Sequence, residues 1–199
     1  MPADELDELL RDRFDLERAD FIAAFKTLPA HRPWSATLND DDARLLDAAG
    51  LPEDRVAYAE VAADVTLHMA RLFSTAYTAA EVADGLGVSA SRIRQRRLNH
   101  SLWAVDDGGS WVYPAAQFDL ADTGPGTPLA FKQVRGLDQV LPQLLTSGLH
   151  PAAVASFLLA PQHDLLIDGR RMCVREWLLH GEPTAPVLNL VDIGEWASR

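Results

Sequence analysis

The segment that most constrains the fold lies at residues 78–99, TAAEVADGLGVSASRIRQRRLN, where the sequence predicts two short helices on either side of a glycine. Thr78 and Glu81 have the spacing of a capping box, in which each side chain accepts a hydrogen bond from the other residue's backbone amide. Gly87 suits the left-handed conformation of a tight turn, and Ser89 suits the N-cap of the second helix. The segment therefore predicts a helix-turn-helix.

Apolar residues in this segment fall where they would face a common small core: Val82, Leu86, Val88 and Ile93, with the small Ala83 allowing close helix packing. The chain then changes character at residues 102–114. The β-favouring stretches Leu-Trp-Ala-Val and Trp-Val-Tyr flank Asp-Asp-Gly-Gly at 106–109, which is a hairpin signal. We expect a small two-stranded β wing after the two helices.

Helical periodicity predicts helices on both sides of this module. Residues 4–28 fit one long helix or two short ones, a second helix is capped at 39–42 and closed by Gly50, and a third runs from Pro52 to about Phe73. Short helices are expected at 137–145, 151–159, 174–179 and 184–196. The stretch 122–128 holds two glycines and two prolines in seven residues, as a linker would.

The predicted fold class is therefore mainly α, in four parts. A helical N-terminal region (1–75) precedes a winged helix-turn-helix (76–121), and a linker (122–128) leads to a small helical C-terminal domain (129–199).

The formal net charge of -11 argues at first against a nucleic-acid partner, because DNA is a polyanion. The distribution of charge along the chain nevertheless favours a nucleic-acid partner. Four of the 18 basic residues fall within positions 92–97, while the acidic excess lies in residues 1–64. A basic patch on an acidic body favours a sequence-selective, salt-sensitive DNA-binding protein over a general DNA coat.

Four polar residues recur at i, i+3, i+4 and i+7 and are predicted to form one base-contacting stripe facing away from the core: Arg92, Gln95, Arg96 and Asn99. Arginine can bridge the O6 and N7 atoms of guanine, and glutamine or asparagine can pair with adenine. Ser91 is expected to contact a phosphate or a base, and Arg94 and Arg97 to contact phosphates. The alternative is a solvated helix face, or one that pairs with the acidic N-terminal region.

We expect no catalytic residues, metal or cofactor. The sequence contains no Gly-rich phosphate loop, HExxH or GxSxG motif, and its histidines do not fall at metal-ligand spacing. The single cysteine, Cys173, is expected to be a small buried residue. No apolar run approaches a membrane span and the first ten residues are acidic, so a cytoplasmic protein without a membrane partner is expected.

Two parts of the chain resemble known bacterial modules. Residues 76–119, with SRIRQRRLNHSLWAV, a hairpin and YPAAQFD, resemble the winged helix-turn-helix modules of bacterial regulators. Residues 150–196 resemble the toxin-binding domain of antitoxins of the Xre/MbcA/ParS type, through Ala155, Phe157, Leu158, Pro161, Leu165, Gly169, Trp177, Leu178, Gly181 and Val187. The resemblance implies an antitoxin that blocks a cognate toxin through its C-terminal part and represses its own operon.

The C-terminal segment is amphipathic, and Val191, Glu195 and Trp196 are expected to contact the partner. Because many helix-turn-helix proteins use two-fold symmetry to span two half-sites on double-stranded DNA, we expect a homodimer, with residues 1–75 as the candidate dimerisation region. Two alternatives stay open. The first is a transcriptional regulator without a toxin partner. The second is a protein-interaction module whose helix-turn-helix does not bind DNA.

Overall fold

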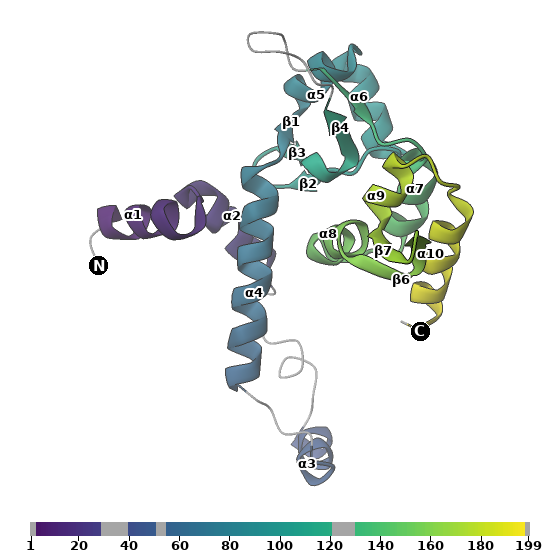
Figure 1. The fold of residues 1–199 in the computed structure, drawn as a ribbon. Coiled ribbons are helices and arrows are strands. Elements are labelled where there is room, and N and C mark those ends of the chain that lie inside the picture. Colours follow the sequence, from purple (N-terminus) through teal and green to yellow (C-terminus); the bar gives the residue numbers. More distant parts are fainter. Residues whose placement is uncertain (1–2, 29–39, 51–54, 121–129, 198–199) are drawn as a thin grey trace. The chain divides into compact units, whose positions relative to one another are not determined.

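A computed structural model describes residues 3–28, 40–50, 55–120 and 130–197 of the chain. These residues form ten α-helices, one short 3-10 helix and seven short strands, all paired antiparallel, which confirms the mainly α class (Figure 1). The chain divides into two compact units, Met1–Ser74 and Thr75–Arg199. Each unit is described by itself below.

The first unit is entirely helical over its described residues, with α1 (Ala3–Phe14), α2 (Arg18–Thr27), α3 (Asp40–Ala48) and α4 (Arg55–Ser74). The predicted helical stretch 4–28 forms two helices, because Asp15 adopts a positive φ of 55° and the chain turns there. Helices α2 and α4 pack on each other, and the buried residues of the unit include Leu10, Leu16, Ala24, Met69, Ala70, Leu72 and Phe73. The predicted cap at residue 39 and the predicted helix start at Pro52 lie outside the described residues.

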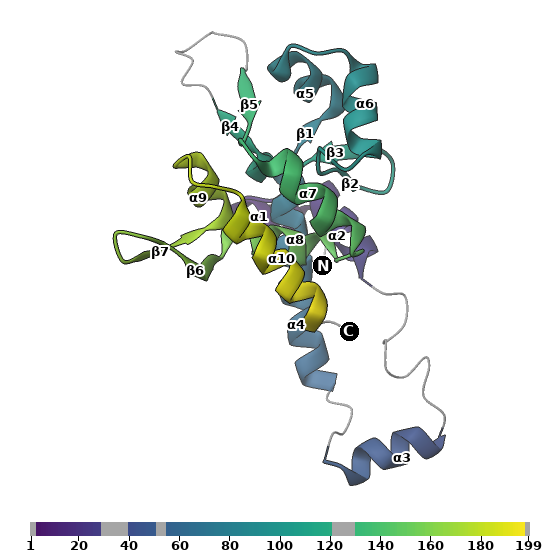
Figure 2. The same cartoon turned by 90° about the vertical axis from the view of Figure 1, so that its right-hand side faces the viewer.

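The second unit begins with the segment that the sequence singled out. Strand β1 (Tyr77–Thr78) leads into α5 (Ala79–Leu86) and α6 (Ala90–Leu98), and β2 (Val105–Asp106) and β3 (Trp111–Tyr113) form the expected hairpin. The sheet has a third strand that the sequence did not reveal, because β1 pairs antiparallel with β3, in the order β1-β3-β2. The hairpin is thereby joined to the start of α5 (Figure 2).

A second pair of strands corrects the predicted boundary between the last two domains. After the 3-10 helix Ala115–Gln117, β4 (Phe118–Leu120) pairs with β5 (Phe131–Gln133), which follows the predicted linker. Phe131 is buried in the same cluster as Val82, Ile93 and Phe118. Residues 122–128 themselves lie outside the described residues, but the strand beyond them belongs to the core of α5 and α6.

The rest of the second unit contains four helices and one hairpin: α7 (Leu137–Thr146), α8 (Pro151–Leu159), β6 (Pro161–Ile167), β7 (Arg170–Cys173), α9 (Val174–Leu179) and α10 (Ala185–Ala197). The helices lie where the sequence predicted them. The β6–β7 hairpin was not predicted, although its turn has the Asp-Gly pair that favours hairpins. Asp168 and Gly169 adopt φ values of 50° and 78°, as a tight hairpin turn requires.

Two polar side chains, Gln117 and Arg175, make hydrogen bonds between segments of the second unit that are distant in sequence. The Gln117 side chain is fully buried; its Oε1 accepts from the Trp103 amide at 2.9 Å, and its Nε2 donates to the Trp103 carbonyl at 2.7 Å. Arg175 of α9 donates to the carbonyl oxygens of Ala116 and Phe118 at 3.1 and 3.0 Å. Helix α9 is thus hydrogen-bonded to the backbone around β4.

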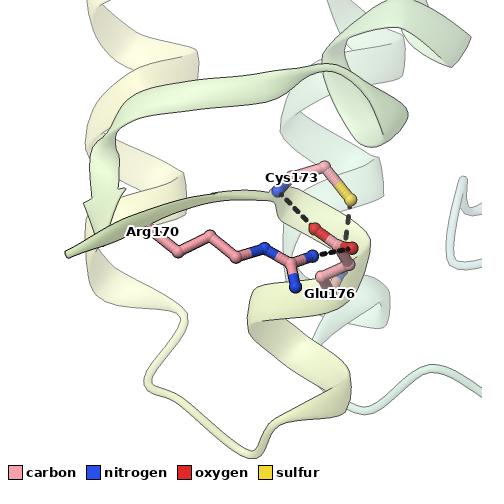
Figure 3. Close-up of polar contacts among 3 residues, drawn as sticks. All are labelled: Arg170, Cys173 and Glu176. Atoms are coloured by element: carbon pink, nitrogen blue, oxygen red, sulfur yellow. Dashed lines mark hydrogen bonds and ion pairs between the residues drawn. The ribbon is translucent and has the colours of Figure 1, made fainter. Parts of the chain in front are cut away.

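Figure 3 shows the start of α9, which positions Arg175. The Cys173 amide donates to Glu176 Oε2 at 3.1 Å and the Glu176 amide donates to Cys173 Sγ at 3.3 Å, so a cysteine takes the N-cap position. Arg170 Nη2 donates to Glu176 Oε1 at 2.9 Å. Burial raises the pKa of the Cys173 thiol, and the hydrogen bond from the Cys173 amide lowers the pKa of Glu176. Cys173 is buried, as expected, and also caps this helix.

Candidate nucleic-acid interface

The helix that carries the basic cluster, α6, is oriented by local signals on both sides of the turn that precedes it. The Thr78 amide donates to Glu81 Oε2 at 2.8 Å and the Glu81 amide donates to Thr78 Oγ1 at 3.2 Å, which confirms the capping box. Gly87 adopts the left-handed conformation with φ 64°, and Ser89 Oγ accepts from the Arg92 amide at 3.3 Å. The start and direction of α6 therefore follow from residues 78–89.

The inner side of α6 packs on the core of the second unit. Ile93 is 1% exposed and belongs to the cluster that contains Val82 and Phe131. Leu86 and Val88 are partly buried against the same cluster, so the predicted inward-facing set is confirmed. With this side buried, only the opposite side of the helix is free to contact a partner.

Arg96 lies toward this inner side, which corrects its predicted place in the exposed stripe. Its Nη2 donates a short hydrogen bond to Oε1 of Gln133 in β5. Gln133 Nε2 donates to the Ser101 carbonyl at 2.7 Å, and Ser101 Oγ donates to the Arg96 carbonyl at 3.3 Å. Desolvation lowers the pKa of Arg96, and the nearby charge of Arg92 adds to this effect. Arg96 therefore joins α6 to β5 and does not face outward.

The reason for the correction lies in the helical phase. Residues three and four apart on a helix share a face, so Arg96 and Arg97 lie beside Ile93 and not opposite to it. The polar pattern at i, i+3, i+4 and i+7 from Arg92 was predicted to face away from the core, and this is wrong at Arg96.

Arg97 packs on the hairpin. Its Cζ lies 4.0 Å from the centroid of the Trp111 ring of β3, a cation–π contact. Arg97 is half-buried, and its charge slightly offsets the burial that raises the pKa of Tyr113. The contact fixes the guanidinium of Arg97 between α6 and β3. Trp111 was missed as a site residue, since nothing local in the sequence pairs it with α6.

The outer side of α6 carries a polar and basic surface. Its exposed members are Ser91, Arg92, Arg94, Gln95 and Leu98. Arg92 Nη1 donates to Gln95 Oε1 at 2.7 Å, so these two side chains are already aligned with each other. The structure thus brings together Ser91, Arg92, Arg94 and Gln95 of the predicted set, and adds an apolar residue, Leu98, that the prediction left out. Arg94, predicted to contact a phosphate, is exposed on the same outer side as Gln95, so it becomes a candidate for base contact.

Asn99 ends the helix and has a local role. It is the C-cap residue of α6, and its Oδ1 accepts from the Ser101 amide at 3.1 Å. The side chain is exposed, but its acceptor oxygen is used in this turn. The predicted adenine contact, in which an amide both donates and accepts, would use this same acceptor oxygen.

The tip of the β2–β3 hairpin is acidic. Ser110 Oγ donates to Asp107 Oδ2 at 3.2 Å, and the Ser110 amide donates to Asp107 Oδ1 at 2.7 Å. Asp106 Oδ1 accepts from the Gly108 amide at 2.8 Å. The two carboxylates order the turn, and their charge would repel a phosphate backbone.

The predicted partner-contacting residues fall on α10. Val191 is 4% exposed and packs within the second unit, so in this structure it is a core residue and not part of a surface. Glu195 and Trp196 lie in the last turns of the helix, where side chains are outside the described set. Exposed leucines occur instead on neighbouring elements, at Leu149, Leu159, Leu166 and Leu179.

Among the described residues, no group of three or more His, Cys, Asp or Glu side chains is placed to hold a metal ion. Within that same part of the chain, no helix is both long and apolar enough to cross a membrane. Comparisons with protein-family models, curated proteins and solved structures found no match to this chain.

Proposed function

We propose that the chain binds double-stranded DNA and that α5, α6 and the β2–β3 hairpin act as a winged helix-turn-helix, with α6 in the major groove. The observation that carries the proposal is the outer side of α6. Arg92, Arg94 and Gln95 are exposed there, on a helix whose start is capped and whose opposite side is buried. A helix of this kind fits the width of the major groove.

The side chains on this surface have the chemistry of base recognition. Arginine donates two hydrogen bonds to guanine O6 and N7, and glutamine pairs with adenine N6 and N7. The side chains of Arg92 and Gln95, which are hydrogen-bonded to each other, both come from α6. Arg97, held against Trp111, supplies a charge for a phosphate. These contacts would specify both sequence and position on the duplex.

The negative charge outside α6 opposes binding to DNA of arbitrary sequence. The chain has a net charge of -11, and the hairpin tip carries Asp106 and Asp107. Few phosphates are therefore neutralised, so affinity at physiological salt would depend on the base contacts. We infer a sequence-selective protein.

The proposal is tested by binding of the full chain to a duplex from its own upstream DNA, with fluorescence anisotropy as the readout. Arg92→Ala and Arg94→Ala are each expected to weaken binding by about 1–3 kcal/mol, the cost of one lost base contact. Arg171→Ala is the matched control, because Arg171 is also exposed in the second unit but lies on β7. If both α6 variants bind as the control does, α6 is not the DNA-contacting helix.

Arg96→Ala separates the two roles considered for that residue. A base contact predicts lower DNA affinity with unchanged stability, whereas the hydrogen bond to Gln133 predicts lower stability of the second unit. We expect the second result, measured by urea unfolding, because the donor of a part-buried hydrogen bond is removed.

We further propose that the chain is a cytoplasmic antitoxin that binds a cognate toxin and represses its own operon. This rests on the resemblance of residues 150–196. It is supported by the exposed leucines of the same region, among them Leu159 on α8 and Leu179 on α9. Helices α8 and α9 contact each other, and a contiguous exposed apolar surface is typical of the face that a protein partner covers.

The antitoxin proposal is tested by co-expression with the product of the adjacent gene. The two proteins should co-purify and growth should be rescued, and Leu159→Asp with Leu179→Asp should abolish both effects. Leu120→Asp on β4 is the control, with 57% exposure outside the C-terminal region. Point changes are preferred to removal of residues 150–199, because that removal would also delete Arg175 and its hydrogen bonds to β4.

The outcomes separate the alternatives. DNA binding without any effect of the adjacent gene product would indicate a transcriptional regulator with no toxin partner. Toxin binding without DNA binding would indicate a protein-interaction module.

A homodimer through residues 1–75 is part of the same proposal. The first unit exposes Ile22 and Phe25 of α2, at 47% and 52%. Light scattering should give twice the chain mass for the wild type, and Phe25→Asp should lower it. A wild-type mass of one chain would remove this part of the proposal.

A further inference from the structure

Leu98 is the one residue of the outer side of α6 whose chemistry does not suit water. It is 65% exposed, whereas Ile93, on the other side of the same helix, is 1% exposed. A single exposed leucine is common on protein surfaces. The exposure of Leu98 is informative because of the polar and charged residues that lie beside it on α6.

Leu98 shares a face with the residues that we assign to base contact. It lies four residues after Arg94, three after Gln95 and seven after Ser91, which places all four on one side of α6. Its Cβ is expected about 5–6 Å from those of Arg94 and Gln95, which is the spacing of helix neighbours. Whatever covers Leu98 must therefore also face Arg94 and Gln95.

This requirement decides the kind of partner. A protein surface apolar enough to cover Leu98 would have to desolvate Arg94 as well, and buried unpaired charges are costly. The major groove offers both chemistries at once. It carries base acceptors for the arginines, and the C5-methyl group of thymine is an apolar group on its floor.

We propose that Leu98 contacts the C5-methyl group of a thymine beside the base pairs contacted by Arg94 and Gln95. The inference rests on the proposed DNA binding and adds to it. It predicts that the bound site contains a thymine at one position for each α6, and that the methyl group itself carries part of the specificity.

The test uses the full chain and a duplex selected from a random-sequence pool by repeated binding. Each thymine of that duplex is replaced in turn by deoxyuridine, which lacks only the methyl group. Replacement at one position should weaken wild-type binding about threefold to fivefold, the affinity equivalent of one buried methyl group. The same replacement should have no effect on Leu98→Ala.

Two further variants keep the result interpretable. Leu98→Met retains an apolar side chain and should keep the deoxyuridine penalty. Leu166→Ala removes a comparably exposed leucine, 53%, from β6 and should also keep it. Circular dichroism of each variant checks that the helices are retained.

Each outcome has one meaning. If no deoxyuridine position weakens wild-type binding, or if the penalty is equal in Leu98→Ala, the thymine contact is wrong while DNA binding stands. If no duplex is selected over random sequence, DNA binding itself is wrong and the contact of Leu98 falls with it.

Discussion

The packing of Phe131 on Gly85 decides whether Gly85→Ala raises or lowers the free energy of unfolding. Gly85 lies in the last turn of α5, and a Cβ built on it would lie 2.5 Å from both Cε1 and Cζ of Phe131. The ring has little freedom to move away. It is 3% exposed, with the rings of Phe118 and Tyr77 at centroid distances of 4.6 and 5.0 Å.

Two effects of Gly85→Ala oppose each other. Alanine in place of glycine within a helix stabilises by about 1 kcal/mol when its surroundings are open. Forcing an extra methyl group into a packed core costs about 1–3 kcal/mol. We therefore expect Gly85→Ala to lower the free energy of unfolding by about 1 kcal/mol, where an open helix would show an increase of that size.

A second substitution isolates the contact. Phe131→Val removes the Cε1, Cζ and Cδ1 atoms that the new methyl group would meet. In that background Gly85→Ala should become stabilising by up to about 1 kcal/mol, so the coupling between the two positions is about 2 kcal/mol.

Urea unfolding followed by tryptophan fluorescence measures all four proteins of this cycle. Trp103, Trp111 and Trp177 lie in the second unit, so the signal reports mainly on its unfolding. If Gly85→Ala stabilises the wild-type protein, or has equal effects with and without Phe131, then β5 does not pack on α5 and the reasoning about this core is refuted.

Three further predictions concern polar contacts of the second unit. Gln117→Leu should lower the free energy of unfolding by about 2–4 kcal/mol in urea unfolding, since it leaves the buried amide and carbonyl of Trp103 unpaired; an effect below 1 kcal/mol would contradict this. Arg175→Ala should destabilise by about 1–3 kcal/mol and speed amide hydrogen exchange around β4, and unchanged exchange would argue against the link. Hydrogen bonds from Thr78 lower the pKa of Glu81, so its contribution to stability is present above the ordinary glutamate pKa of about 4.3 and is lost as the pH falls through the lower folded value. Glu81→Gln should therefore flatten the pH dependence of the urea midpoint in that acidic range, and an unaltered slope would count against the capping contribution.

The start of α6 was predictable because its signals are local. The pair Thr78 and Glu81, the turn at Gly87 and the cap at Ser89 each act within four residues, and all were found as expected. Local capping chemistry competes with few long-range effects at an exposed helix end. The outer residues of α6 followed from the same helix.

The place of Arg96 shows what local reasoning leaves out. Its partner Gln133 lies 37 residues away in sequence, on a strand too short to give a periodic signal. Pairing of short strands depends on what the rest of the chain packs against them, and the sequence carries little of this. The spacing of three residues between Ile93 and Arg96 on α6 does, however, predict that Arg96 lies on the same side as the buried Ile93.

The β6–β7 hairpin was a missed signal of a different kind. The pair Asp168 and Gly169 is a strong hairpin turn, but helices on both sides led to a prediction of helices throughout. The helical bounds of α8 and α9 were nevertheless predicted to the residue. Turn chemistry is therefore a stronger signal at this position than the average composition around it.

The same long-range contacts change the extent of the module that we propose to contact DNA. Phe131 supplies a buried ring to the core of α5 and α6, and Gln133 holds Arg96 of α6. Both lie beyond the Gly- and Pro-rich stretch at 122–128 that composition marked as a boundary. A fragment ending at residue 121 would lose one of the largest side chains of a core that is already small, and burial of a phenylalanine contributes about 1.5–3 kcal/mol. The orientation of α6 is thus a property of the whole second unit. Substitutions within the full chain, and not fragments of it, are the appropriate way to assign its contacts.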